Sequence, residues 1–202
     1  MAFGASGSVE MVSRDRSNGY EAVAAEFMAR RGGVGAGTVR RWASALVPGA
    51  AVLDLGCGHG VPITQVLMDG GFGVHGIDAS PTLIAAFRDR FPAVPAECAA
   101  VEESAFFGRT FDGVVAWGLI FLLPADTQTA LVRKVTRILN RGGRFLFTSP
   151  LAACTWPDAQ TGQPSISLGS EVYRRILATA GLEHVGEASD EGDNHYHFAH
   201  KR

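Results

Sequence analysis

A glycine-rich segment, VLDLGCGHG at residues 52–60, constrains the fold of this chain more than any other stretch of the sequence. A short apolar run leads into it, and Gly56, Gly58 and Gly60 follow at intervals of two. Glycines let the backbone turn sharply and approach a ligand closely, with the N-terminus of the next helix behind them. The segment therefore predicts a strand, a tight turn and a helix over residues 62–69.

The rest of the chain continues this alternation of strands and helices. We expect further helices at residues 20–30, 38–47, 80–88, 127–139 and 170–180. We expect strands at residues 51–55, 74–77, 96–99, 113–117 and 144–148, and a final strand pair at 184–189 and 195–201. Strands alternating with helices predict an α/β fold, a doubly wound parallel sheet with helices on both faces. The final pair would add one antiparallel strand.

The length of 202 residues suits one domain with a sizeable core. Residues 1–17 show neither helical nor strand periodicity and are expected to be disordered, so the domain is expected to span residues 18–202. Residues 150–168 are rich in Pro, Ser, Thr and Gly. We expect them to form an inserted loop over the ligand crevice, because long loops in compact domains are usually functional or mobile.

Composition limits the environment and the partners of the protein. The formal net charge is −2 and no run of five basic residues occurs, so no nucleic-acid partner is expected. The three cysteines form no C-x-x-C pair, which argues against a disulfide framework and favours a reducing, cytoplasmic location. No apolar run approaches a membrane span and no leader pattern is visible, so no membrane association is expected.

A carboxylate 22 positions after Gly56 makes the glycine-rich segment more specific. Asp78 ends the next expected strand, where an acidic residue meets a ribose diol in doubly wound folds. The spacing G-x-G-x-G departs from the dinucleotide pattern G-x-G-x-x-G. Asp54, just before the loop, would repel a pyrophosphate and suits a cationic amino group. The pattern therefore favours a nucleoside that carries an amino acid over NAD.

Four ordered motifs carry a family resemblance. VLDLGCGHG at 52–60, GIDAS at 76–80, FDGVVAWG at 111–118 and LNRGGRFLFTSP at 139–150 together resemble the class I, Rossmann-like S-adenosylmethionine-dependent methyltransferases of small molecules. The resemblance covers residues 20–200. It implies a seven-stranded sheet with an antiparallel last strand, S-adenosylmethionine as cofactor, S-adenosylhomocysteine as product, and methyl transfer to an O, N, S or C atom of a small-molecule acceptor.

The resemblance also implies which residues meet the cofactor. Asp54, Gly56, Gly58 and Gly60, with Cys57 between them, would line its methionine part, and Asp78 would take the ribose hydroxyls. Ala79 and Ser80 would lie beside the adenine, and Trp117 and Gly118 would border the transferable methyl group.

Two positions depart from the family pattern. Ala100 stands where many members have an Asp that bonds adenine, so the backbone of Val101 or the carboxylate of Glu102 would substitute. Residues 119–124 are wholly apolar, so no histidine there offers a base. Phe121 is then expected to line an apolar acceptor pocket.

Candidate catalytic residues come from the C-terminal turn and from the inserted loop. A base is needed only when the acceptor arrives protonated. His195 is the candidate base, with Asn194 and Tyr196 orienting the acceptor; the alternative is an ordinary solvated turn over residues 190–194. Asp158 and Trp156 would form an acceptor lid, the alternative being a surface loop anchored by one buried Trp.

Two further features have competing interpretations. Tyr20 in the first helix would cap the site or pack in the core. His195, His197 and His200 suggest a metal site because residues two apart on a strand share one face, but no carboxylate completes an evident set, so no metal is expected.

Three rival functions remain open beside small-molecule methyl transfer. They are a non-catalytic module of the same fold that binds a nucleoside or a partner, an NAD-dependent oxidoreductase, and a nucleic-acid methyltransferase. The glycine spacing disfavours the second, and the charge balance disfavours the third. The oligomeric state is expected to be a monomer or a homodimer.

Overall fold

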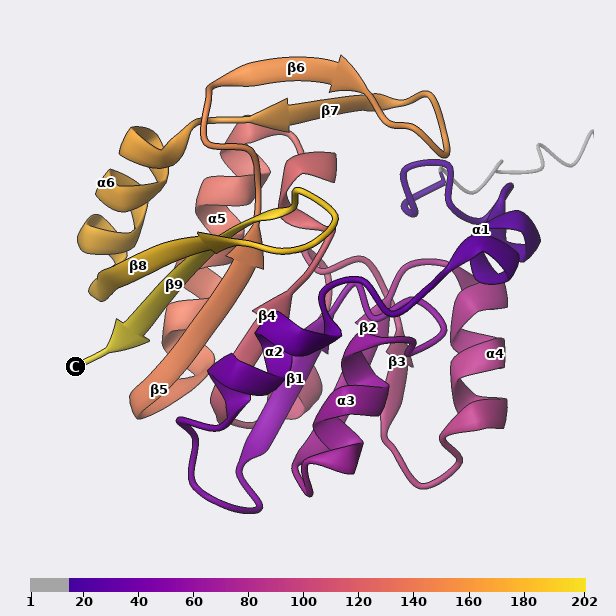
Figure 1. The fold of residues 1–202 in the computed structure, drawn as a ribbon, viewed down its shortest axis with the longest axis horizontal. Helices are drawn as coiled ribbons and strands as arrows, with labels where there is room; N and C mark the ends of the chain where they lie inside the picture. The colour runs from indigo at the N-terminus through magenta and orange to yellow at the C-terminus, as the bar shows by residue number, and fades with distance from the viewer. Residues whose placement is uncertain (1–14) are drawn as a thin grey trace, which may run out of the picture.

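The computed structural model describes residues 15–202 (Figure 1). The first 14 residues of the segment expected to be disordered lie outside this part of the chain. At its start, one oxygen of Asp15 accepts the backbone N–H of Ser17 at 2.8 Å and the other accepts that of Gly19 at 2.9 Å. Two short helices follow, α1 (Ala24–Arg30) and α2 (Ala36–Ala43). The first begins four residues later than expected because residues 20–23 form turns.

A seven-stranded sheet forms the centre of the described chain, in the order β3-β2-β1-β4-β5-β9-β8. The strands are β1 (Ala51–Leu55), β2 (Gly73–Asp78), β3 (Ala96–Cys98), β4 (Phe111–Ala116), β5 (Leu139–Thr148), β8 (Leu182–Ser189) and β9 (His195–Lys201). The first five pair in parallel, and β9 lies antiparallel between β5 and β8. The expected seven-stranded, mostly parallel sheet with an antiparallel last strand is confirmed.

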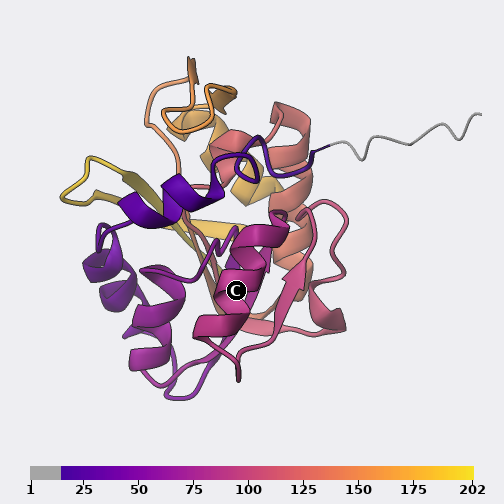
Figure 2. The ribbon, with the colours of Figure 1, turned by 90° about the vertical axis from the view of Figure 1, so that its right-hand side faces the viewer.

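Helices cover both faces of the sheet, as Figure 2 shows with the sheet turned toward its edge. They are α3 (Ile63–Asp69), α4 (Pro81–Arg90), α5 (Ala125–Ile138) and α6 (Ser170–Ala180), joined by the short 3-10 turns η1 (Phe106–Gly108) and η2 (Ile120–Leu122). Alternate strand residues enter opposite cores: Val52 packs with α2, α3 and α4, whereas Leu53 packs with α5 and α6. This two-residue period is the geometric reason why the buried strands are apolar throughout.

Local signals define several helix ends correctly. The Ser80 hydroxyl accepts the backbone N–H of Leu83 at 3.1 Å, and Pro81 occupies the first helical position of α4. Gly181 ends α6 with φ +89°, a left-handed conformation that favours glycine.

Two expectations are wrong. The expected loop over residues 150–168 contains an antiparallel hairpin, β6 (Cys154–Pro157) and β7 (Pro164–Ser167), which lies across the top of Figure 1. The composition of this segment does not indicate the hairpin, because hydrogen bonds from distant residues stabilise it. The Gln128 amide, for example, donates to the Ile166 carbonyl at 2.9 Å. In addition, β5 begins at Leu139, not at 144, because Leu139 pairs with Phe111 across a register irregularity.

Within the described residues, no helix combines the length and apolar character needed to span a membrane.

The turn between β1 and α3 tests how much of the glycine pattern is structural. Gly56, Gly58 and Gly60 have φ of +69°, +55° and +88°. A Cβ atom on Gly60 would lie 2.3 Å from Cε2 of Phe91, so no side chain fits there. Gly71, just after α3, has φ +78° with open space around it. The two glycines therefore separate the cost of backbone strain from the cost of a clash.

We predict that Gly60→Ala destabilises the protein more than Gly71→Ala. The positive φ should cost about 1–2 kcal/mol at either position. The clash with Phe91 should add about 1–3 kcal/mol at position 60 alone. Urea unfolding followed by circular dichroism measures both variants, and equal unfolding midpoints would contradict the packing role of Gly60.

Candidate functional site

The main cavity, of about 270 Å³, opens at the carboxyl ends of the central strands. Asp54 in β1, Asp78 at the end of β2 and Trp117 after β4 line it. Parallel strands present their carboxyl ends at one edge of the sheet, which is where doubly wound folds bind ligands. Strands distant in sequence thus bring the predicted residues together.

Asp54 is a buried carboxylate with one side-chain partner, the Thr64 hydroxyl, which donates to it at 2.7 Å. Burial and the nearby Asp78 raise the pKa of Asp54, the Thr64 hydrogen bond and the positive charge of Arg31 lower it, and the net pKa is about 7. The group therefore changes charge near neutral pH and is suited to a cationic ligand group.

Arg31 is a cavity residue that the sequence interpretation missed. It follows α1, and its guanidinium lies 3.9 Å from the ring centroid of Trp117 and 5.3 Å from that of Phe27. Burial lowers its pKa to about 10, opposed by Tyr20, Asp54 and Tyr196, so it is charged at neutral pH. The sequence offered no signal, because an Arg before a glycine-rich breaker is also typical of a solvated helix end.

Asp54 and Arg31 give the same cavity an anionic and a cationic side chain. A free α-amino acid group carries an ammonium and a carboxylate on one carbon. The pair therefore complements a zwitterionic amino acid, each side chain facing the ligand charge of opposite sign.

Asp78 joins the glycine-rich turn to the end of β2. Its carboxylate accepts the backbone N–H of Gly58 at 2.8 Å and that of Ser80 at 2.9 Å. Burial raises its pKa, while the hydrogen bonds from the backbone of Ser80, Gly58 and Ala79 lower it. The carboxylate lines the cavity beside Ala79, at the place expected for a ribose diol.

The residues expected on the adenine side of the site also lie together in the cavity. Ala100, Val101 and Glu102 line the cavity. The Lys134 ammonium donates to the carbonyl oxygens of Val101 and Glu102, both at 2.9 Å. Lys134 thus orders this turn from α5, a positioning contact that no local pattern signals.

Most of the predicted cofactor residues line the cavity, and two do not. Those that line it are Asp54, Gly56, Cys57, Gly58, Asp78, Ala79, Val101, Glu102, Trp117 and Gly118. Gly60 packs against Phe91 instead, and the fully buried Ser80 caps α4. Both residues therefore support the elements that form the site without lining the cavity.

A second cavity adjoins the first. The two share Phe121, Asp158, Ala159 and Asn194, and His195 and Trp156 line the second alone. The rings of Phe121 and Trp156 lie 5.4 Å apart between centroids. Three of the predicted acceptor residues, Phe121, Trp156 and Asn194, therefore come together from η2, the β6–β7 hairpin and the β8–β9 turn.

Tyr196 does not face either cavity, and its expected contact with the acceptor is wrong. Alternation along β9 turns it into the core under α2, opposite to His195. Its hydroxyl donates to Asp190 at 2.6 Å and accepts the Trp117 indole N–H at 2.6 Å. The Asn194 amide also donates to Asp190, at 3.0 Å. Asp190, which the sequence interpretation did not single out, orders this turn and, through Tyr196, holds Trp117.

Tyr20 and Asp158 meet across the mouth of the main cavity. The Tyr20 hydroxyl donates to one oxygen of Asp158 at 3.3 Å, and burial raises the pKa of Tyr20. The other oxygen of Asp158 accepts the backbone N–H groups of Gln160 and Thr161 at 3.0 and 2.9 Å. Asp158 therefore holds the hairpin turn against the N-terminal segment, which leaves it little freedom to act as a base.

His195 is partly buried on the wall of the second cavity. Its Nε2 atom lies 3.7 Å from Oε2 of Glu187. Burial lowers its pKa, with Glu187 opposing, so the ring is neutral near pH 7. A neutral imidazole is the form that a proton acceptor needs.

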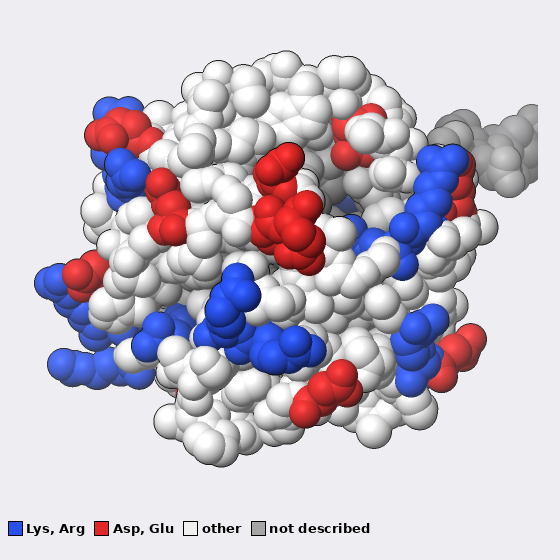
Figure 3. Space-filling view, viewed as in Figure 1, with Lys and Arg blue, Asp and Glu red and all other residues white. Residues whose placement is uncertain are grey.

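The charged side chains on the face seen in Figure 3 are mixed in sign, with basic and acidic groups interspersed around the hollow. This face therefore offers no extended basic track of the kind that follows a phosphate backbone.

Comparisons with known proteins agree with this geometry. Residues 52–143 match the family model described as a methyltransferase domain. A sarcosine/dimethylglycine N-methyltransferase of Aphanothece halophytica is 27% identical over 165 residues, covering 73% of this chain; the chain spans 58% of the length of that relative.

Two of the solved structures that share the fold illustrate the likeness. The 1,6-didemethyltoxoflavin-N1-methyltransferase of Burkholderia thailandensis, with 1,6-didemethyltoxoflavin and S-adenosylhomocysteine bound, has a TM-score of 0.72, 18% identity, and coverage of 90% of this chain and 84% of that one. The CcbJ methyltransferase of Streptomyces caelestis has a TM-score of 0.71, 17% identity and coverage of 92% and 97%. The resemblance to class I methyltransferases is thereby confirmed, by sequence over residues 52–143 and by fold over the wider chain.

We predict that Asp54→Asn stabilises the protein above pH 7. The pKa of Asp54 rises on folding from 3.8 to about 7. The folded state therefore binds more protons between these values, and stability falls as the pH rises through them. The upper limit of this loss is about 4 kcal/mol. Thermal unfolding from pH 5 to 8 should show the gap between variant and wild type growing with pH.

Asp69→Asn, which changes an exposed carboxylate on α3, is the matched control and should follow the wild type. Parallel pH curves for the wild type and Asp54→Asn would contradict the raised pKa.

Proposed function

We propose that this chain, a class I methyltransferase by the sequence family of residues 52–143 and by fold, transfers the methyl group of S-adenosylmethionine to an O, N, S or C atom of a small-molecule acceptor and releases S-adenosylhomocysteine. The observation that carries the proposal is the Asp54–Arg31 pair in one cavity with Asp78 at the end of the next strand. Together they complement the amino acid and the ribose of one ligand.

The residues that line the main cavity fit this cofactor. Asp54 would face the ammonium group and Arg31 the carboxylate of the methionine part, while Asp78 would accept hydrogen bonds from the ribose hydroxyls. Val101 and Glu102 would border the adenine. They would take over the role of the Asp that many members of the family have where this chain has Ala100. The relative from Burkholderia thailandensis binds S-adenosylhomocysteine in the same fold.

The bound cofactor supplies an electrophilic methyl group on a sulfonium, whose departure as a thioether is favourable. The chain then has to align the acceptor atom with the methyl group and exclude water. Trp117 borders that position, and both Tyr196 and Arg31 hold its ring. Phe121 and Trp156, which line the second cavity, would provide an apolar wall for the acceptor.

His195 would remove the proton of an acceptor that arrives protonated, and Asn194 would orient that acceptor at the junction of the two cavities. Nitrogen is the first acceptor atom to screen, because two of the relatives, by name, methylate nitrogen.

Several wider expectations belong to the same proposal. Residues 18–202 would act as one domain, with the β6–β7 hairpin covering the crevice. The protein would work on small molecules in the cytoplasm, not on nucleic acid, as a monomer or a homodimer. A non-catalytic module of the same fold is the alternative, and binding of the cofactor without turnover on amine, hydroxyl and thiol acceptors would favour it.

We predict micromolar binding of S-adenosylmethionine and S-adenosylhomocysteine, and no binding of NAD, in isothermal titration calorimetry. Asp78→Ala should weaken both by about 10–100-fold, because it removes charge-assisted hydrogen bonds worth about 1.5–3 kcal/mol. Asp69→Asn serves as the control and should bind like the wild type. If neither sulfur nucleoside binds, the enzyme proposal fails.

We also predict that this binding weakens as the pH falls below 7. The ammonium group of the ligand requires ionised Asp54, whose pKa is about 7, so the affinity should fall by up to about tenfold per pH unit. Methylthioadenosine, which has the nucleoside and sulfur but no amino acid, should bind without this pH dependence. Arg31→Gln should weaken S-adenosylhomocysteine and leave methylthioadenosine unchanged; equal losses would contradict the assigned contacts.

A further inference from the structure

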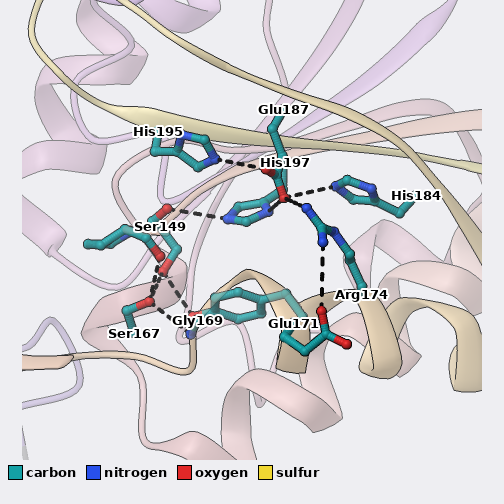
Figure 4. Close-up of polar contacts among 11 residues, drawn as sticks. Ser149, Ser167, Gly169, Glu171, Arg174, His184, Glu187, His195 and His197 are labelled. Carbon is teal, nitrogen blue, oxygen red and sulfur yellow. Dashed lines mark hydrogen bonds and ion pairs between the residues drawn. The ribbon is translucent and has the colours of Figure 1, made fainter. Parts of the chain in front are cut away.

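Three histidines and a glutamate lie together between the β8–β9 pair and α6, away from the main cavity (Figure 4). Glu187 is at the centre. Its Oε1 atom lies 3.5 Å from Nε2 of His184 and 3.7 Å from Nδ1 of His197. Its Oε2 atom lies 3.7 Å from Nε2 of His195. The ring nitrogens of His184 and His197 and a Glu187 oxygen lie within 4.8 Å of one another.

The strand register explains how these residues meet. His195 and His197 are two apart on β9 and share a face, and Glu187 on β8 pairs directly with His197. His184 is three residues before Glu187 and would face the other way in a regular strand. A register irregularity between His184 and Gly186 turns it back to the same face. Glu187 is thus the carboxylate that the histidine pattern of the sequence lacked.

The proton on His197 is placed by its second contact. Its Nε2 lies 3.3 Å from the backbone carbonyl oxygen of Ser149, which can only accept. Nε2 therefore carries the proton, and the lone pair of Nδ1 faces Glu187. The ring is fully buried and stacked on Phe147 at 4.7 Å between centroids, so it cannot turn away. A histidine anchored through one nitrogen on a carbonyl is the usual arrangement of a metal ligand.

The other two rings face Glu187 in the same way. The facing nitrogens of all three rings are buried and have no hydrogen-bond partner among the described residues. Contacts of 3.5–3.7 Å are longer than hydrogen bonds. The lone pair of His197 Nδ1, directed at a carboxylate, repels it unless a cation lies between them.

Arg174 compensates only part of the negative charge of Glu187. Its Nη2 donates to Oε1 of Glu187 at 2.9 Å from the solvent side of α6, and its side chain is 46% exposed. It makes no contact with the three facing ring nitrogens among the interactions of the described residues. It is placed to orient the carboxylate, the role that outer partners of metal ligands have.

We propose that His184, Glu187 and His197 bind one Zn²⁺ ion. Two imidazole nitrogens and one carboxylate oxygen form a ligand set that Zn²⁺ favours, with bond lengths of about 2.0–2.2 Å. Donors of a tetrahedral site with such bonds lie about 3.3–3.5 Å apart. The separations of 3.5 and 3.7 Å between Glu187 and the two histidine nitrogens are close to this range, and the two nitrogens lie within 4.8 Å of each other. The ion would join β8 to β9. His195, which faces the other oxygen of Glu187, lies beside it and lines the second cavity.

The proposal is tested on the full chain by metal binding, independently of methyl transfer. The exposed Cys98 and Cys154 are first replaced by Ser, since free thiols also bind Zn²⁺. The chelator-treated protein is then titrated with Zn²⁺ against a chromogenic chelator. We expect one equivalent to bind, and His184→Gln to weaken binding by about 100-fold or more, above the effect of losing an outer-shell partner.

His200→Gln is the matched control, since His200 is on the same strand and pairs instead with Glu183. It should bind Zn²⁺ like the parent. His195→Gln should also retain the ion, because His195 lies outside the three-residue set. Less than 0.1 equivalent bound by the parent, or equal losses in His184→Gln and His200→Gln, would overturn the proposal.

A spectroscopic measurement covers the case in which a variant misfolds. Co²⁺ bound to the parent protein should give the intense visible bands of a four-coordinate site, displaced by one equivalent of Zn²⁺. Weak bands typical of six-coordinate aqueous Co²⁺ would exclude the site in the folded chain. Binding of S-adenosylhomocysteine, measured beside it, separates this outcome from a failure of the proposed enzyme function.

Discussion

The hydrogen bonds between the glycine-rich turn and the end of β2 are the contacts on which the rest of the site depends. The backbone N–H groups of Gly56 and Cys57 both donate to the carbonyl oxygen of Ile77, at 2.8 and 3.0 Å. The N–H of Gly58 donates to the Asp78 carboxylate at 2.8 Å. These bonds hold the turn open at the sheet edge, which sets the positions of both cavity carboxylates and of the first turn of α3.

Burial of charge is the cost of this arrangement and also its functional value. Asp54 and Arg31 lose hydration in the cavity, and the shifted pKa of each measures that loss. In the proposed function, a ligand with an amino acid group would return a partner to each charge, and the unfavourable burial of the free protein would become selectivity for a zwitterion. Stability and ligand binding therefore make opposite demands on Asp54.

Outer contacts keep the walls of the cavities in place. A chain of hydrogen bonds runs from Asp190 through Tyr196 to Trp117, and Lys134 fixes the turn on the adenine side. The β8–β9 pair has two different faces. One face carries Tyr196, and the other carries the histidine cluster around Glu187. One antiparallel pair thus supports both the proposed methyl-transfer position and the proposed Zn²⁺ site.

Local patterns in the sequence were sufficient for the order of strands and helices, the glycine-rich turn, Asp78, the start of α4 and the end of α6. Each of these depends on neighbours within a few residues, or on an alternation that every buried strand repeats. The tertiary structure alone decided that Arg31 enters the cavity, that Tyr196 turns inward and that polar residues 154–167 form a hairpin. It also decided that Glu187 faces His197, because strand register and a bulge set that pairing, and neither has a local signature. Contacts between distant segments carry the chemistry that the sequence by itself left open.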